Sequence, residues 1–165
     1  QKYEDILAFY YRDTALYTVG TFETAPRIKA EGCTFQSCGI SGIKPGTTTE
    51  KLLGKLQSDG VLSIIDKKGA KKEGTLCTGD SVRNTYDNGL AIFDLPIVIY
   101  GDIDGSGKID KDDITALQKH LIRSSILGGP YLIAADVNHD ETVDIMDMIR
   151  LIQYVSDDAK ITQED

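Results

Sequence analysis

Residues 101–113 read GDIDGSGKIDKDD, and a related stretch, ADVNHDETVDIMD, follows 34 residues later at 135–147. Both stretches alternate acidic or amide side chains with other residues around a tight turn. Side-chain oxygens at alternating positions of a turn converge on one point, where they can surround a hard cation. The repeat therefore predicts two cation-binding loops of the same kind.

The first stretch fits a calcium loop of the EF-hand type. Such a loop takes oxygen ligands from positions 1, 3, 5, 7, 9 and 12, and it prefers glycine at position 6 because the backbone turns there through positive φ. Counted from position 1, the predicted ligands are Asp102, Asp104, Ser106, Lys108 through its backbone carbonyl, Asp110 and Asp113. Gly107 occupies position 6, so the first loop meets every requirement.

The second stretch meets the same requirements with one departure. Its predicted ligands are Asp136, Asn138, Asp140, Thr142 through its carbonyl, Asp144 and Asp147. Position 6 is Glu141, and a residue other than glycine in a left-handed conformation costs about 1 kcal/mol. We expect this second site to bind its ion more weakly than the first.

The donor set indicates which ion is bound. All side-chain ligands are hard oxygens, with no His or Cys among them, which favours calcium over a transition metal. The alternative is that Asp-rich turns only cap helices, since Asp is common at helix starts. Two matches in register at a fixed spacing favour the metal, and the sequence predicts two bound Ca²⁺.

A helical pattern follows each loop, and no entering helix precedes the first loop. Three apolar residues recur after each loop at i, i+3 and i+7, and they are predicted to be core: Ile114, Leu117, Leu121, Met148, Leu151 and Val155. Before the first loop, residues 90–100 read LAIFDLPIVIY, which is typical of a strand. Each unit is therefore a loop with an exiting helix only, which argues against a calcium sensor built from complete EF-hands.

These features resemble the dockerin family, the calcium-dependent docking modules of cellulosomal proteins. The resemblance covers residues 100–156 and includes Asp at loop position 12, the GDIDGSG opening and AADVN before the second loop. It implies an all-α module of paired loop-helix (F-hand) units over 101–158, with a helical linker near 124–134 and a tail at 159–165.

The resemblance also implies a partner and a location. Dockerins bind a cohesin on a scaffoldin or cell-surface protein, in secreted or surface-attached assemblies of anaerobic bacteria that degrade polysaccharides. In that family, loop positions 10 and 11 and positions further along the same helix face make the contacts. The candidate contact residues here are Lys111, Asp112 and Gln118 of the first unit, and Ile145, Met146 and Ile152 of the second.

The two candidate faces differ in chemistry. Ile145, Ile149 and Ile152 form one apolar stripe on the second helix, whereas the corresponding first-helix positions are polar. An exposed apolar stripe favours a partner, so we predict that the second helix is the main recognition surface and that a cohesin binds in one orientation. The alternative is that the stripe packs against the linker, at Ile126, Leu127 and Tyr131, or against the N-terminal part of the chain.

The first hundred residues predict a β-rich domain with one short helix. Strands are expected at 6–11, 15–22, 61–66 and 90–100, and Thr47 with Glu50 forms a potential capping box before a helix. No flexible tether precedes Gly101, which predicts a rigid border between two modules. Residues 40–100 resemble the small β-rich X modules that precede certain dockerins, and residues 1–40 belong to the same module or to the end of another.

Charge and composition limit the function. The net charge of −8 comes entirely from residues 101–165, which carry fourteen acidic and six basic side chains. No basic stripe suited to nucleic acid is present, and no apolar run is long enough for membrane insertion. No catalytic constellation is recognisable, so we expect no enzyme. The alternative function is a calcium-stabilised carbohydrate-binding or catalytic fragment of a glycan-degrading protein.

Three cysteines leave the redox state open. Cys33 and Cys38 bracket four residues and could form a disulfide in an exported protein, with Cys77 left over. Three reduced thiols are an equal alternative.

Overall fold

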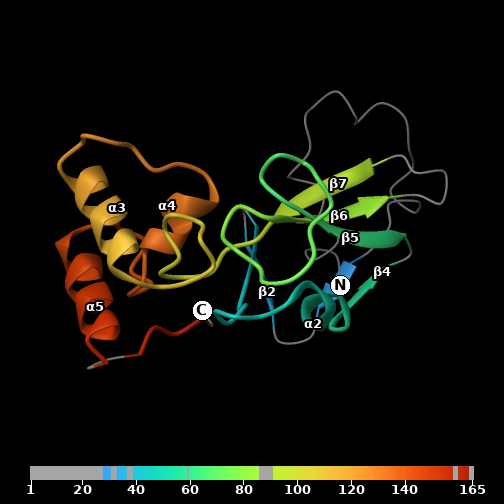
Figure 1. The fold of residues 1–165 in the computed structure, drawn as a ribbon, viewed down its shortest axis with the longest axis horizontal. Helices are drawn as coiled ribbons and strands as arrows, with labels where there is room; N and C mark the ends of the chain where they lie inside the picture. The colour runs from blue at the N-terminus through green and yellow to red at the C-terminus, as the bar shows by residue number, and fades with distance from the viewer. Residues whose placement is uncertain are drawn as a thin grey trace.

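The computed structural model describes residues 28–30, 33–36, 39–58, 60–85, 91–157 and 160–163. Strands occupy one end of the described molecule and three helices occupy the other (Figure 1). The strands expected at 6–11 and 15–22 lie outside the described residues. A β-rich first part followed by a helical second part agrees with the sequence prediction.

Among the described residues, the named strands form antiparallel pairs, and an isolated parallel bridge joins Ile40 to Ile97. β1 (Ile28–Ala30) pairs with β4 (Leu56–Ser58), β2 (Thr34–Gln36) pairs with β3 (Gly39–Ser41), and β5 (Val61–Ile65), β6 (Ser81–Thr85) and β7 (Ala91–Pro96) form a three-stranded sheet. The strand expected at 61–66 is thereby confirmed. The strand expected at 90–100 ends at Pro96, because proline cannot donate to a sheet ladder.

The short helix begins one residue later than the capping box predicted. α2 (Thr49–Leu53) has Thr48 as its N-cap, whose side chain accepts a hydrogen bond from the Lys51 N–H. The predicted capping box at Thr47 and Glu50 is wrong, because the Thr47 hydroxyl donates to the Lys44 carbonyl at 2.7 Å instead. Thr47 thus closes the preceding turn and is unavailable to the helix.

Two separate hydrophobic clusters divide the described residues. The first contains the buried side chains of β3 to β7 and α2, and it ends at Ile99. The second begins at Tyr100 and includes Ile103, Leu117 and Leu151. We call the parts on either side of this boundary the N-terminal module and the C-terminal module. The two clusters divide between the adjacent residues Ile99 and Tyr100, one residue before the border that the sequence predicts at Gly101.

The C-terminal module contains α3 (Lys111–Leu121), α4 (Pro130–Ala135) and α5 (Ile145–Val155). Its core residues are those predicted from the helical pattern: Leu117 and Leu151 are fully buried, and Ile114, Leu121 and Met148 pack partly buried against them. Val155 is only partly buried. The helical linker expected at 124–134 is shorter than predicted, because Gly128 and Gly129 precede a helix that starts at Pro130.

The last described residues fold back onto the border. The Gln163 side chain bonds both backbone groups of Tyr100: its Oε1 accepts from the Tyr100 N–H and its Nε2 donates to the Tyr100 carbonyl, each at 2.9 Å. Ile161 packs in the second hydrophobic cluster. The segment predicted as a tail at 159–165 is therefore packed against the module at 161–163.

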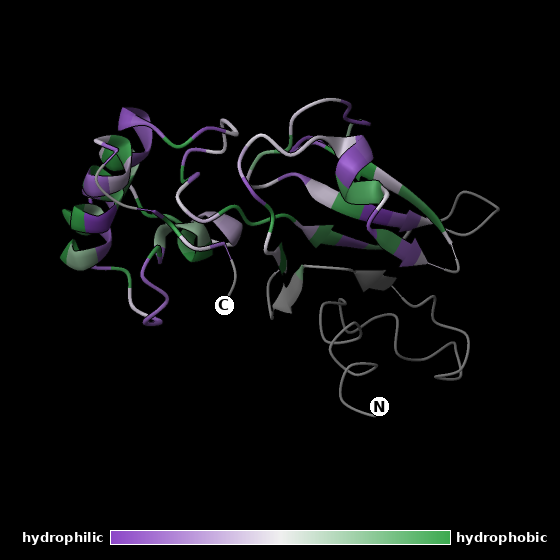
Figure 2. Ribbon diagram, turned by 90° about the horizontal axis from the view of Figure 1, so that it is seen from below, coloured by the Kyte–Doolittle hydropathy of each residue, from purple (hydrophilic) through white to green (hydrophobic). Residues whose placement is uncertain are grey.

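Hydrophobic residues, drawn in green, occur along the strands of the N-terminal module and along the helices of the C-terminal module (Figure 2). Among the described residues, no helix has the length and apolar character needed to cross a bilayer.

Candidate metal centre and exposed helix face

Three carboxylates of the first loop converge on one point. Oxygen atoms of Asp102, Asp104 and Asp113 all lie within 4.8 Å of one another, from loop positions 1, 3 and 12. Asp102 and Asp113 are fully buried, whereas Asp104 is exposed. Burying two carboxylates beside a third is unfavourable unless a cation or hydrogen bonds compensate their charge. The donor set and spacing fit a hard divalent cation with oxygen ligands.

Asp113 holds the first loop together through the backbone. Its Oδ1 accepts hydrogen bonds from the N–H groups of Ile103 at 2.7 Å and Asp104 at 3.1 Å, and its Oδ2 accepts from the Asp110 N–H at 2.8 Å. The loop is thus closed on the carboxylate that position 12 supplies. A loop closed in this way loses little conformational freedom when it binds an ion.

The second loop repeats this arrangement 34 residues later. Asp147 Oδ1 accepts from Val137 at 2.9 Å and Asn138 at 3.2 Å, and its Oδ2 accepts from Asp144 at 2.9 Å. Position 6, Glu141, adopts a φ of 68°, the left-handed conformation expected for this position. The two loops therefore share a backbone design, and the second adopts it without the glycine.

The remaining predicted ligands are engaged within their loops. Ser106 Oγ accepts from the Lys108 N–H at 3.3 Å, while Asp140 accepts from Thr142 and Asn138. Hydrogen bonds from the Thr142 and Asn138 side chains lower the pKa of Asp140. Among the described residues, the three-carboxylate cluster occurs only in the first loop. The ligand roles of Ser106, Lys108 and the second-loop residues stay predictions.

Burial raises the pKa of three carboxyl groups in the loops. Burial, reinforced by the charge of Asp104, raises the pKa of Asp113 to about 6 even though three backbone N–H groups lower it. Burial also raises the pKa of Asp102 and of Asp147. Each of these carboxyl groups therefore releases its proton less readily than an exposed Asp, because burial disfavours the charged form.

The helix-capping alternative describes only some of these carboxylates. Asp110 and Asp144 are the N-caps of α3 and α5, and Asp113 and Asp147 complete capping boxes with them. Capping therefore accounts for loop positions 9 and 12. It gives no reason for Asp102, which lies eight residues before the cap, to be buried beside Asp113.

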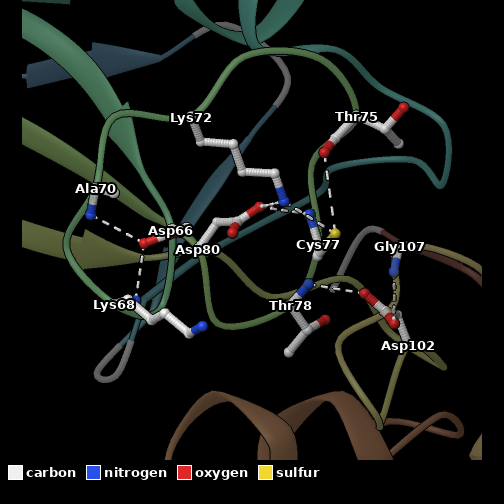
Figure 3. A network of polar contacts seen from close by, with 10 residues as sticks. All are labelled: Asp66, Lys68, Ala70, Lys72, Thr75, Cys77, Thr78, Asp80, Asp102 and Gly107. Carbon is white, nitrogen blue, oxygen red and sulfur yellow. Dashed lines mark hydrogen bonds and ion pairs between the residues drawn. The ribbon is translucent and has the colours of Figure 1, made fainter.

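The first loop also contacts the N-terminal module, which the sequence analysis did not predict. The backbone N–H of Thr78 donates to Asp102 Oδ2 at 2.7 Å, while Gly107 N–H donates to Asp102 Oδ1 at 3.0 Å (Figure 3). The available signal was glycine at 105 and 107, where the second loop has His139 and Glu141. Small residues at these two places indicate a close neighbour.

A second polar cluster lies behind this contact. Asp80 Oδ2 accepts from the Cys77 N–H at 2.8 Å and forms an ion pair with Lys72 at 2.5 Å, and Lys72 Nζ lies 3.0 Å from Cys77 Sγ (Figure 3). Burial lowers the pKa of Lys72, but the hydrogen bonds that Lys72 donates to Asp80 and Cys77 outweigh this effect, and the pKa is raised. Cys33 and Cys77 are free thiols, and burial raises the pKa of Cys33. Cys38 lies outside the described residues.

The predicted stripe on α5 is exposed. The exposed fractions are 51% for Ile145, 54% for Met146, 42% for Ile149 and 42% for Ile152. The alternative in which this stripe packs against the linker is not what the structure has, since Ile126 is itself 68% exposed. The corresponding first-helix residues Lys111, Asp112 and Gln118 are exposed and polar.

The C-terminal module is similar to known proteins. No curated protein matches the chain. A solved structure from Acetivibrio cellulolyticus, the third cohesin ScaC in complex with the ScaB dockerin, covers 40% of this chain and 93% of that chain at 25% identity, with a TM-score of 0.37. The model of the dockerin type I domain matches residues 100–161, which contain both loops and all three helices of the C-terminal module. This segment of the chain is therefore a dockerin type I domain.

Proposed function

We propose that the C-terminal module docks this chain, together with any larger protein that contains it, onto a cohesin of a scaffoldin or cell-surface protein. The observation that supports this best is an apolar face on α5 that stays exposed in a dockerin type I domain. Large apolar side chains at the surface are unfavourable in water unless a partner covers them. A cohesin is the partner that the dockerin family takes.

Two calcium ions are proposed to hold the docking helices in place. In the first loop the ligands would be Asp102, Asp104, Ser106, the Lys108 carbonyl, Asp110 and Asp113, and the second loop would use the corresponding residues from Asp136 to Asp147. When bound, calcium supplies positive charge that neutralises the clustered carboxylates and so stabilises the fold. Position 9 of each loop is the N-cap of α3 or α5, and position 12 lies in the first turn of the same helix. Ion binding and helix orientation are therefore coupled.

The partner is proposed to contact mainly α5. Ile145, Met146, Ile149 and Ile152 present side chains on one face over two turns of helix, and the opposite side of α5 is anchored by Leu151 in the core. Apolar residues presented by a rigid helix lose little entropy on binding. Lys111, Asp112 and Gln118 on α3 would make peripheral polar contacts.

A single binding orientation is proposed for this dockerin. A half-turn that exchanges the two units would place polar Lys111 and Gln118 where Ile145 and Ile152 had been. Polar groups buried without partners oppose binding, so the second orientation would be disfavoured by several kcal/mol. The sequence asymmetry between the units therefore selects one complex.

The N-terminal module is proposed to be a companion, resembling an X module, that stabilises the dockerin and has no catalytic role. It abuts the first loop directly through Thr78, and it has its own hydrophobic cluster. A secreted or surface-attached location follows from the proposed partner.

Calorimetry against a panel of cohesins tests the proposal. The full chain should bind at least one cohesin in calcium and none in excess EDTA, and it should not bind polysaccharides. Failure of every cohesin, with binding to a polysaccharide instead, would favour a calcium-stabilised carbohydrate-binding fragment.

A further inference from the structure

We propose that the N-terminal module forms part of the first calcium centre, with the backbone N–H of Thr78 as a positioning group for the Asp102 carboxylate. Calcium binding at the first loop and association of the two modules would then strengthen each other. The second loop would bind its ion independently of the N-terminal module. This inference rests on the proposed calcium binding, and it adds that one of the two sites is shared between modules.

The N-terminal module contacts Asp102, which is itself a proposed calcium ligand. Thr78 N–H donates to Asp102 Oδ2 at 2.7 Å, and Asp102 is fully buried. Each carboxylate oxygen has two lone pairs, so an oxygen that accepts one hydrogen bond can still face a cation. The N–H therefore orients the position 1 carboxylate from behind, as outer partners of metal ligands commonly do.

Thr78 is fixed by its own module. Its hydroxyl donates to the Ile99 carbonyl at 3.2 Å and accepts from the Ile99 N–H at 3.1 Å. The next residue, Gly79, donates its N–H to the Ile97 carbonyl at 3.0 Å. Asp80, paired with Lys72, closes the same turn by accepting from the Cys77 N–H (Figure 3). The donor is therefore preorganised by contacts that do not involve the calcium loop.

Glycines in the first loop lie where the N-terminal module leaves no room for a side chain. Position 6 has φ of 83° at Gly107 and 68° at Glu141, so the loop conformation itself tolerates a side chain. A β-carbon on Gly107 would lie 2.8 Å from the Leu76 carbonyl oxygen and 2.9 Å from Cys77 Sγ. The neighbouring module thus excludes a side chain that the second loop accommodates.

Position 4 repeats the comparison. Gly105 has φ of 71° and His139 has φ of 62°. A β-carbon on Gly105 would lie 2.7 Å from the Thr78 carbonyl oxygen and 2.9 Å from Cε1 of Tyr131. At two positions, therefore, the same backbone conformation has glycine only in the loop that faces the N-terminal module.

The second loop provides an internal reference. The two oxygens of Asp136 accept from the N–H groups of Asp140 at 3.2 Å and Glu141 at 3.0 Å, within the same loop. Asp136 is also partly exposed, unlike Asp102. Each molecule thus contains one site in which the N-terminal module donates a hydrogen bond to the position 1 carboxylate, and one site in which the loop alone donates to it.

Hydrogen exchange of the Thr78 amide in the full chain tests the coupling without altering the contact. Calcium should slow exchange of this amide about tenfold or more. The slowing should disappear in Asp113→Asn, which damages the first site, and persist in the matched Asp147→Asn, which damages the second. An exchange rate that calcium leaves unchanged, or slowing that Asp147→Asn abolishes equally, would overturn the proposal.

Calcium titration of two variants then tests the donor. Thr78→Pro lacks the N–H, whereas the control Thr78→Val keeps it and loses only the hydroxyl. Loss of an outer-shell partner typically weakens a metal site 10-fold to 100-fold, so Thr78→Pro should weaken the first site by about that factor relative to Thr78→Val and leave the second unchanged. Equal first-site affinities in the two variants would refute the positioning role. If neither site of the wild type binds calcium, the proposed calcium function fails instead; and if Thr78→Pro does not fold, the exchange experiment decides.

Discussion

Asp104 and Asp113 are joined by a hydrogen bond and opposed by charge. Oδ1 of Asp113 accepts from the backbone N–H of Asp104 at 3.1 Å. Burial raises the pKa of Asp113, and the negative charge of the Asp104 carboxylate raises it further. The same backbone contact that closes the loop therefore brings two negative charges together. Without a cation, protonation of Asp113 as the pH falls below about 6 removes one of these two charges.

Stability without calcium should depend on pH. Burial, with the Asp104 charge, raises the pKa of Asp113 from 3.8 to about 6, so the folded state binds this proton more tightly than the unfolded state. The resulting stabilisation is present below the unfolded pKa and is lost as the pH rises through about 6. In EDTA, the free energy of unfolding should fall by on the order of 2 kcal/mol from this group as the pH rises from about 4 to 7. Burial gives Asp102 and Asp147 the same direction.

Thermal unfolding in EDTA and in calcium across this range measures the effect. In calcium the trend should reverse, because bound carboxylates must be deprotonated. Asp113→Asn serves as the control, since it should make the profile in EDTA shallower by the Asp113 contribution. Stability that rises with pH in EDTA over the same window would contradict the account.

Glu141→Gly should strengthen the second site. Glu141 has φ of 68°, which costs an ordinary residue about 1 kcal/mol and glycine almost nothing. Calcium affinity at the second loop should therefore increase up to about fivefold, as measured by calorimetry. The matched change Gly107→Ala in the first loop should have the opposite sign, because its β-carbon would meet the Leu76 carbonyl oxygen at 2.8 Å. Weaker second-site binding by Glu141→Gly would show that Glu141 assists the ion.

Lys72→Met should destabilise the N-terminal module. Asp80 is 3% exposed, and removal of Lys72 would leave its carboxylate buried without its cationic partner. The expected loss is about 2–4 kcal/mol, because an uncompensated buried charge is costly. Lys71→Met is the control, since Lys71 and its partner Glu73 are 73% and 82% exposed and such pairs contribute at most about 1 kcal/mol. Chemical unfolding measures both, and equal losses would contradict the role assigned to Asp80.

Leu151→Ala and Ile149→Ala should separate the core side of α5 from its exposed side. Leu151 is fully buried in the second hydrophobic cluster, so its truncation should reduce the free energy of unfolding by about 2–5 kcal/mol. Ile149 is 42% exposed, and its truncation should cost less than about 1 kcal/mol. Denaturant unfolding in calcium gives both values. A large loss from Ile149→Ala would mean that the stripe is part of the core.

Local patterns in the sequence predicted the C-terminal module well. Loop spacing located Asp102, Asp104 and Asp113, which the structure brings together, and helical periodicity identified Leu117 and Leu151 as core. Ligand spacing within a short loop and apolar spacing along a helix both depend on neighbours a few residues away. A single sequence displays such relationships directly.

Relationships between distant residues were not predictable in the same way. Thr78 and Asp102 are separated by 24 residues, and Tyr100 and Gln163 by 63. Neither pair has a sequence signature, because a backbone N–H is present at almost every position. The Thr47 capping box failed for a related reason: the same hydroxyl can bond a turn carbonyl or a helix N–H, and the sequence does not distinguish them.

The most direct test of the docking account compares cohesin binding by two face variants of the full chain in calcium. Ile145→Asp with Ile152→Asp alters the exposed face of α5, and Lys111→Asp with Gln118→Asp alters the corresponding positions of α3. Calorimetry should show that the α5 variant loses binding at least a hundredfold while the α3 variant loses tenfold or less, with both variants still folded and calcium-bound. Equal affinities for wild type and the α5 variant would contradict the central claim that α5 is the docking face.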